Sequence, residues 1–105
     1  MKALRSPGYE FGPYRLDTVG RSLECRGEVI ALPPKAVEVL AELVKRPGEV
    51  VGKKELMETV WPGTFVEEAN LNQMVFVLRR AIESTKGSEY ITTVPRRGYA
   101  AAETI

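Results

Sequence analysis

The chain has 105 residues, 44% of them hydrophobic and 28% charged, which is typical of one globular domain. It has no histidine and one cysteine, so a Cys/His metal site, an internal disulfide and histidine-based acid–base catalysis are excluded. The net charge of +1 does not by itself indicate a nucleic-acid binder, and no apolar run approaches the ~20 residues that cross a bilayer.

The residue types also argue against an enzyme. There is no glycine-rich phosphate loop and no group of carboxylates at useful spacing, and Cys25, the obvious nucleophile, has no base in view. The N-terminus has no signal-peptide apolar core. We therefore expect a cytoplasmic protein that is not an enzyme, needs no cofactor or metal, and makes no membrane contact through this domain.

Short strands are expected in the first third of the chain. Residues 1–8 lack apolar periodicity and include Pro7 and Gly8, which predicts a flexible arm ahead of one domain at 9–105. Cys25 is expected to be a small buried strand residue. Alternating and turn residues predict an antiparallel β-meander with strands at Glu10–Phe11, Tyr14–Asp17, Ser22–Cys25 and Val29–Leu32.

The pattern then changes to helical spacing. Pro34 suits a first helical position, and "RPG" ends this first helix at Arg46. A short extended "VV" leads to a second helix over "KKELMETVW", which "WPG" ends. The third and longest helix is expected from about 67 to 85, and "PRRG" turns a closing hairpin over 90–102.

At 100° per residue, the third helix has two distinct sides. Leu71, Val75, Leu78 and Ile82 fall within one narrow stripe, which we assign to the core. The opposite side and its flanks carry Ala69, Asn70, Asn72, Gln73, Met74, Phe76, Val77, Arg79, Arg80 and Ser84. Amide and guanidinium groups can pair with base edges, so this side suits a major groove. The alternative is an ordinary solvated face.

Positive charge gathers in the last third of the chain. Five basic and two acidic residues lie between Arg79 and Tyr99, and Arg96 and Arg97 are adjacent at the hairpin tip. Alone, this turn is most simply two solvated charges. A helix, turn, helix and basic hairpin in this order, however, predict an α+β winged helix-turn-helix behind the N-terminal meander. Its wing arginines would contact phosphates or a narrow minor groove.

Three segments resemble the OmpR/PhoB-type winged-helix domain, which CadC-like one-component regulators also use: "ALPPKAVEVLAELVKRPGEVVGKKELMETVWPG", "NLNQMVFVLRRAIE" and "YITTVPRRGYAA". The resemblance starts at about Phe11. It implies a four-stranded N-terminal sheet, three helices, a C-terminal hairpin, and binding to double-stranded promoter DNA as a weak homodimer. It also implies contact with RNA polymerase through the 62–66 loop. Because Met1 lies close to the first strand, we expect this domain at the N-terminus of a one-component regulator.

The residue patterns and the resemblance together predict a set of DNA contacts. The set is Lys53, Lys54, Trp61, Asn70, Asn72, Gln73, Phe76, Val77, Arg79, Arg80, Thr93, Arg96, Arg97 and Tyr99. By resemblance, Trp61 matches a phosphate contact and Thr93 a wing residue near the DNA backbone. Arg79 matches a basic position of the recognition helix, and Tyr99 the aromatic residue that closes the wing.

Phe76 and Val77 leave two interpretations open. In the groove they would contact thymine methyl groups; as an exposed apolar patch they would be covered by another domain, a second subunit or the wing. The main hypothesis is the DNA-binding domain of a bacterial-type transcriptional regulator. The alternative is a winged-helix protein-interaction module without specific DNA binding.

Overall fold

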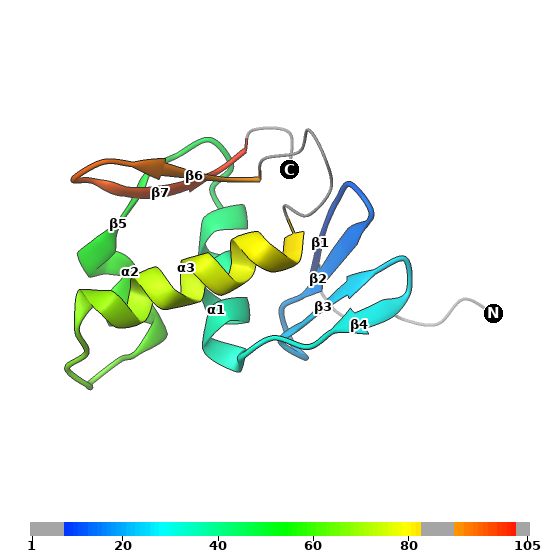
Figure 1. Ribbon diagram of the computed structural model, residues 1–105, viewed down its shortest axis with the longest axis horizontal. Helices are drawn as coiled ribbons and strands as arrows, with labels where there is room; N and C mark the ends of the chain where they lie inside the picture. The colour runs from blue at the N-terminus through cyan, green and yellow to red at the C-terminus, as the bar shows by residue number, and fades with distance from the viewer. Residues whose placement is uncertain (1–7, 83–89, 103–105) are drawn as a thin grey trace.

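The computed structural model describes residues 8–82 and 90–102, which form two antiparallel sheets and three helices (Figure 1). The first sheet, in the order β1-β2-β3-β4, consists of β1 (Gly8–Phe11), β2 (Tyr14–Asp17), β3 (Ser22–Cys25) and β4 (Glu28–Ile30). The helices are α1 (Pro34–Val44), α2 (Lys53–Val60) and α3 (Glu68–Ile82). The second sheet, in the order β5-β7-β6, consists of β5 (Val51–Gly52), β6 (Ile91–Val94) and β7 (Gly98–Ala101). The predicted fold class is confirmed.

The first sheet is joined to the rest of the domain by aromatic and aliphatic packing. Leu16 and Leu23 lie opposite each other in the β2–β3 pair, and both are fully buried. Phe11, Tyr14 and Tyr90 form a cluster with ring centroids 5.2 to 5.8 Å apart. Because Tyr90 directly precedes β6, this cluster connects the first sheet to the C-terminal hairpin.

α1 and α3 supply most of the helical part of the core. α1 buries Ala36, Val37, Val39, Leu40, Leu43 and Val44. α3 buries Leu71, Val75, Leu78 and Ile82, the four residues that helical periodicity assigns to the core, so this prediction is confirmed. Within residues 8–82 and 90–102, no helix has the length and apolar character needed to span a bilayer.

β5 attaches the C-terminal hairpin to the helices. Gly52 pairs with Gly98, and the Lys53 N–H donates to the Arg97 carbonyl oxygen at 3.3 Å. A Cβ on Gly98 would lie 2.0 Å from the Val51 carbonyl oxygen, so only glycine allows this approach of β5 and β7. The tip of the hairpin is therefore held beside the start of α2.

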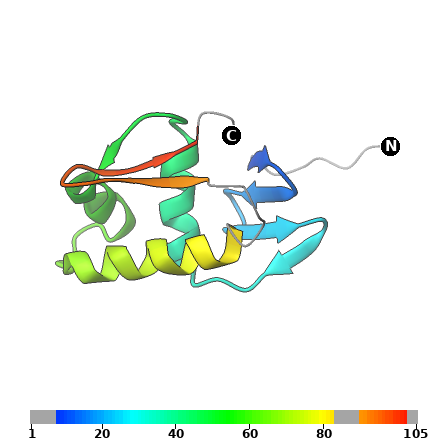
Figure 2. The ribbon, with the colours of Figure 1, turned by 45° about the horizontal axis from the view of Figure 1, so that its top comes forward.

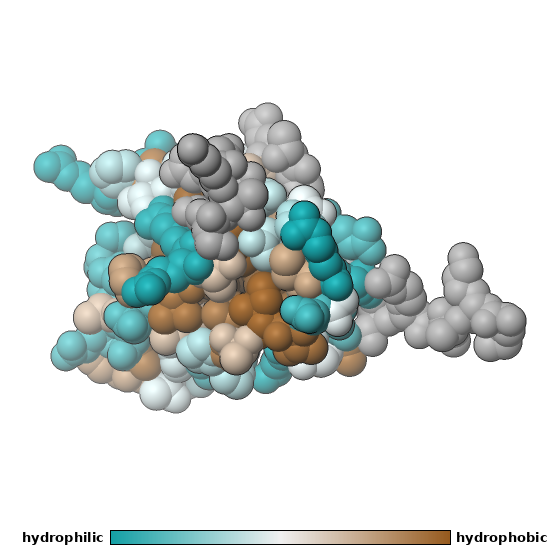
Figure 3. Space-filling view, turned by 45° about the vertical axis from the view of Figure 1, so that its right-hand side comes forward, coloured by the Kyte–Doolittle hydropathy of each residue, from teal (hydrophilic) through white to brown (hydrophobic). Residues whose placement is uncertain are grey.

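The hairpin and α3 run in roughly the same direction in both ribbon views (Figures 1 and 2). The β6–β7 turn lies at the end of the molecule away from the first sheet. In the space-filling view, hydrophilic side chains project at the upper left, where Figure 1 places this turn, and apolar side chains gather nearer the centre (Figure 3). The β6–β7 turn thus forms a hydrophilic projection at one end of the domain.

The ends of two predicted segments need correction. The arm predicted at residues 1–8 includes Gly8, which is instead the first residue of β1 because the backbone of β2 pairs with it at Asp17. α3 begins at Glu68, one residue later than the predicted 67–85 helix. The end of that prediction, with Ser84, and residues 1–7 lie outside the described residues.

The first two helices are shorter than predicted. α1 ends at Val44 and not at Arg46, because the Arg46 N–H already donates to a carbonyl three residues back at 3.2 Å, as in a tightened last turn. α2 ends at Val60 and not at Trp61. Trp61 has φ −123° and ψ 64° because a residue before proline is disfavoured in the helical conformation.

The predictions for β4, Cys25 and the closing hairpin were also inaccurate. β4 begins at Glu28, earlier than predicted, because a two-residue turn brings Glu28 directly opposite Cys25. Cys25 is half-buried and not buried, since it lies at the end of its strand. In the 90–102 hairpin, Tyr90 and Ala102 lie just outside the strands, although the Ala102 N–H donates to the Tyr90 carbonyl oxygen at 2.9 Å.

The close approach of β5 and β7 predicts a strong effect of Gly98→Ala. The added methyl group would force the strands apart, and we expect a loss of roughly 2 kcal/mol in the free energy of unfolding. Gly52→Ala is the matched control, because its Cβ would make an ordinary 3.7 Å contact with the Arg97 carbonyl oxygen. Urea denaturation followed by circular dichroism gives both values. Equal losses in the two variants would contradict this packing.

Candidate nucleic-acid interface

The outward side of α3 presents polar groups around one aromatic ring. Asn70, Asn72, Gln73 and Arg80 are exposed. Phe76 is 55% exposed and lies among them. The buried stripe occupies the opposite side of the same helix, so these side chains point away from the core. This side can offer amide and guanidinium hydrogen bonds together with one apolar contact.

Val77 does not belong to this exposed set. It is half-buried, whereas the sequence places it on the outward side beside Phe76. Val77 lies on the flank of α3 that carries Met74 and Ala81, and both of these pack against the core. The apolar patch expected from Phe76 and Val77 is therefore reduced to the Phe76 ring.

Phe76 is stacked with Arg80, one helical turn further along α3. The Arg80 guanidinium carbon lies 5.8 Å from the centroid of the Phe76 ring. This is within the range of a cation–π contact, which is worth about 0.5–1 kcal/mol at exposed sites. The apolar ring and the cation are thus presented to a partner as one unit.

Arg79 is directed at the wing. Its Nη2 donates to the Thr93 hydroxyl and, at 3.2 Å, to the Ile91 carbonyl oxygen. Its guanidinium carbon is 6.0 Å from the centroid of the Tyr99 ring. Arg79 and Thr93, both predicted to contact DNA, therefore use their polar groups to connect α3 with β6.

A second connection joins α3 to β7. Tyr99 is only 5% exposed, and its hydroxyl donates to Asn72 Oδ1 at 2.8 Å. This hydrogen bond turns the acceptor end of the amide towards the wing and fixes the direction of the Asn72 NH2 group. Tyr99 is therefore buried against α3, and its hydroxyl orients the Asn72 amide.

The start of α2 is tied to the start of α3. Lys53 Nζ lies 2.6 Å from Glu68 Oε2, and this hydrogen bond raises the pKa of Lys53. Lys54 is exposed, and Trp61 is half-buried with its side chain against the core. Of the two predicted lysines, Lys54 is the one without an ion pair to α3 in the described residues.

The wing tip presents two exposed arginines, Arg96 and Arg97. Arg96 has a φ of 67°, and the Arg97 N–H donates to the Val94 carbonyl oxygen at 3.0 Å, which closes the turn. The tip is therefore a hydrogen-bonded turn on which both arginines are exposed.

The sequence did not predict the contacts that join α3 to the wing and to α2, for a physical reason. Tyr99 and Asn72 are 27 positions apart, and Lys53 and Glu68 are 15 apart. No local periodicity relates such pairs, so only the packing of α3 on the wing and on α2 brings them together.

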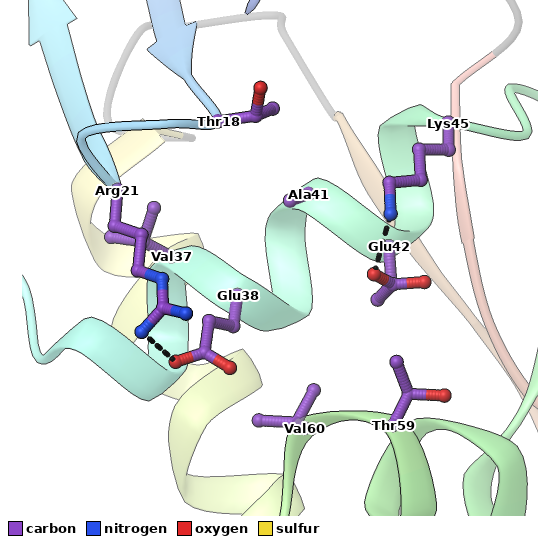
Figure 4. Close-up of a pocket in the computed structure, with 9 residues that line it drawn as sticks. All are labelled: Thr18, Arg21, Val37, Glu38, Ala41, Glu42, Lys45, Thr59 and Val60. Atoms are coloured by element: carbon purple, nitrogen blue, oxygen red, sulfur yellow. Dashed lines mark hydrogen bonds and ion pairs between the residues drawn. The ribbon is translucent and has the colours of Figure 1, made fainter.

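A polar cavity of about 180 Å³ lies on another part of the molecule, between the β2–β3 turn, α1 and α2 (Figure 4). Arg21 and Lys35 pair with Glu38 at 3.3 and 3.6 Å, and Lys45 pairs with Glu42 at 2.9 Å. Arg21, Glu38, Glu42 and Lys45 line the cavity, so the charged groups on its wall are paired with one another. The cavity lies between the first sheet and the helices, and no described residue of α3 lines it.

The fold and this surface define a winged helix-turn-helix. Residues 27–101 match the family described as "Transcriptional regulatory protein, C terminal". The chain belongs to this family and is the DNA-binding domain of a transcriptional regulator. It is therefore neither an enzyme nor a protein-interaction module without DNA binding.

A matched relative is also a transcriptional activator. The chain is 40% identical over 75 residues to the "Cholera toxin homolog transcriptional activator" of Vibrio parahaemolyticus, a match that covers 69% of this chain and 26% of that protein. The chain thus spans about a quarter of this relative's length. The match confirms the expected class but does not extend to the rest of the longer protein.

Solved structures confirm the resemblance to OmpR/PhoB-type and CadC-like domains. The response regulator DrrB of Thermotoga maritima, an OmpR/PhoB homologue, has a TM-score of 0.78 and 31% identity, covering 90% of this chain and 44% of DrrB. The DNA-binding domain of Escherichia coli CadC has a TM-score of 0.79 and 26% identity, covering 93% of this chain and 94% of that domain.

The hydrogen bond between Tyr99 and Asn72 predicts energetic coupling between the wing and α3. In a double-mutant cycle with Tyr99→Phe and Asn72→Ala, we expect a coupling of about 0.5–1.5 kcal/mol in the free energy of unfolding. Urea denaturation of the four proteins measures it. Purely additive effects would show that the two side chains do not hold the wing against the helix.

Proposed function

We propose that α3 lies in the major groove of duplex DNA and that the 90–102 hairpin contacts the neighbouring backbone or minor groove. One observation carries this proposal: Asn70, Gln73 and Arg80 are exposed on the side of α3 opposite its fully buried stripe. A helix supported in this way can enter the major groove, where amides and guanidinium groups distinguish base pairs.

The local charge supports a polyanionic partner despite the net charge of +1. Residues 69–80 include two arginines and no acidic residue. Glu68, which precedes them, is paired with Lys53. Arg96 and Arg97 add positive charge at the wing tip. The positive field is therefore concentrated where the phosphates would lie.

The contacts divide into two groups. Direct contacts with DNA are proposed for Lys54, Trp61, Asn70, Asn72, Gln73, Phe76, Arg80, Arg96 and Arg97. Lys53, Arg79, Thr93 and Tyr99 are proposed mainly to hold α2, α3 and the wing in position, because their polar groups already bond to neighbouring elements. Val77 is proposed to support the neighbouring side chains from its half-buried place.

The 62–66 loop is proposed to contact RNA polymerase, as the family resemblance implies. Phe65 in this loop is 91% exposed. Beside it lies a groove of about 430 Å³, whose lining includes Met57, Trp61 and Val66. Such an exposed apolar side chain next to a groove is typical of a protein contact.

The remaining expectations concern the whole protein. The domain is proposed to bind DNA as a weak homodimer, which would place two recognition helices on repeated sites. It is also proposed to be cytoplasmic, because that is where it would meet promoter DNA. The domain is also proposed to be part of a longer regulator, since the Vibrio relative extends well beyond the matched region.

The proposal predicts how salt affects binding. If Lys54, Arg80, Arg96 and Arg97 supply the main phosphate contacts, log K should fall with log salt at a slope of about −3 to −4. Replacing Arg96 and Arg97 together by alanine should reduce the size of this slope by about 2 and weaken binding to all sequences alike. Fluorescence anisotropy with a labelled duplex at several salt concentrations measures both effects.

Arg26→Ala is the matched control for the wing variant. Arg26 is also an exposed turn arginine with a positive φ, 52° against 67° for Arg96, but it lies in the β3–β4 turn at the other end of the molecule. It should leave the slope unchanged. A wild-type slope near zero, or equal slopes for the wing variant and the wild type, would contradict the proposed docking.

A further inference from the structure

The geometry points to Phe76 as a specificity-determining residue that recognises the 5-methyl group of thymine. The operator should then carry a thymine opposite the middle of α3, and replacing it should weaken binding without any lost hydrogen bond. This inference rests on the proposed docking of α3 in the major groove and adds the base that its aromatic residue selects.

Phe76 lies in the middle of the outward side of α3. Gln73, Phe76 and Arg80 follow one another along the outward side of α3 at spacings of three and four residues, so they form one ridge. Phe76 is in the middle of this ridge and is 55% exposed, while the buried stripe prevents α3 from rotating it into the core. A helix that enters the groove along this ridge brings the Phe76 ring, the large exposed apolar side chain of α3 in the described residues, to the base edges.

The chemistry of the Phe76 ring limits what it can recognise in the groove. Phenylalanine has no hydrogen-bond donor or acceptor, so it can discriminate between base pairs only by apolar contact. The thymine C5-methyl is the apolar group that the major groove displays. Polar base edges placed against the ring would lose hydrogen bonds to water without replacement. A thymine methyl is therefore the feature of the groove that the ring complements.

A protein surface is a poorer partner for Phe76 than DNA is. Covering Phe76 would also cover Arg80, whose guanidinium carbon lies 5.8 Å from the ring centroid. A buried guanidinium needs an anion close by. DNA supplies the methyl group on the groove floor and phosphates at the groove edge. The half-burial of Val77 leaves Phe76 as the large exposed apolar side chain on the described part of α3, too little for a broad apolar patch on this helix.

The test uses an operator selected from random duplexes with the wild-type domain. Each thymine is then replaced, one at a time, by deoxyuridine, which lacks only the methyl group, and dissociation constants are measured at one salt concentration. We expect a three- to fivefold weakening, roughly the value of one buried methyl, at one or two positions. In Phe76→Ala this sensitivity should disappear, while Phe76→Leu should retain part of it.

Phe65→Ala is the matched control, because Phe65 is an exposed phenylalanine outside α3. It should keep the full response to deoxyuridine, and circular dichroism should show both alanine variants folded. Tight wild-type binding with no thymine position sensitive to deoxyuridine would overturn the inference alone. An unchanged response to deoxyuridine in Phe76→Ala would also overturn the inference. If that variant had lost dimerisation, the ring would be assigned to a protein contact. No salt-dependent binding to any duplex would overturn the proposed function and the inference with it.

Discussion

The burial of one side of α3 is the constraint on which the rest of the structure depends. Leu71, Leu78 and Ile82 are fully buried, and each such side chain contributes about 1.5–3 kcal/mol on leaving water. Turning the helix by one residue would expose this stripe and desolvate groups such as the Gln73 amide, which is costly without hydrogen-bond partners. The packing that stabilises the domain therefore also fixes which side chains α3 presents outward.

The wing depends on α3 in turn. Arg79 bonds to β6 and Asn72 to Tyr99 of β7, so two polar groups on one flank of the helix set the distance between helix and hairpin. Gly98 holds the other edge of the hairpin against β5. These bonds occupy polar groups of Arg79, whose proposed role is to position the wing. Because the helix and the wing are held together in this way before DNA binds, the entropy cost of association is lower.

Periodicity and turn residues were sufficient to predict the helices, the buried stripe of α3 and the closing hairpin, because these features are local. The four-stranded N-terminal sheet also followed from alternation and turns, with an error at β4. The predicted helix ends were less accurate. The end of α2 depends on Pro62, and because a proline acts on the residue directly before it, the sequence alone could have predicted that the helix ends before Trp61. The roles of Arg79 and Tyr99 were not accessible, since their partners are decided by tertiary packing between distant segments.

We propose that duplex DNA contacts the exposed side of α3 together with the wing tip. Nuclear magnetic resonance titration of the labelled domain with its selected operator tests this most directly. The largest shifts should fall on the side-chain amides of Asn70 and Gln73 and on the backbone of Arg96 and Arg97. Shifts concentrated on the β1–β4 sheet, with those amides unchanged, would contradict the account.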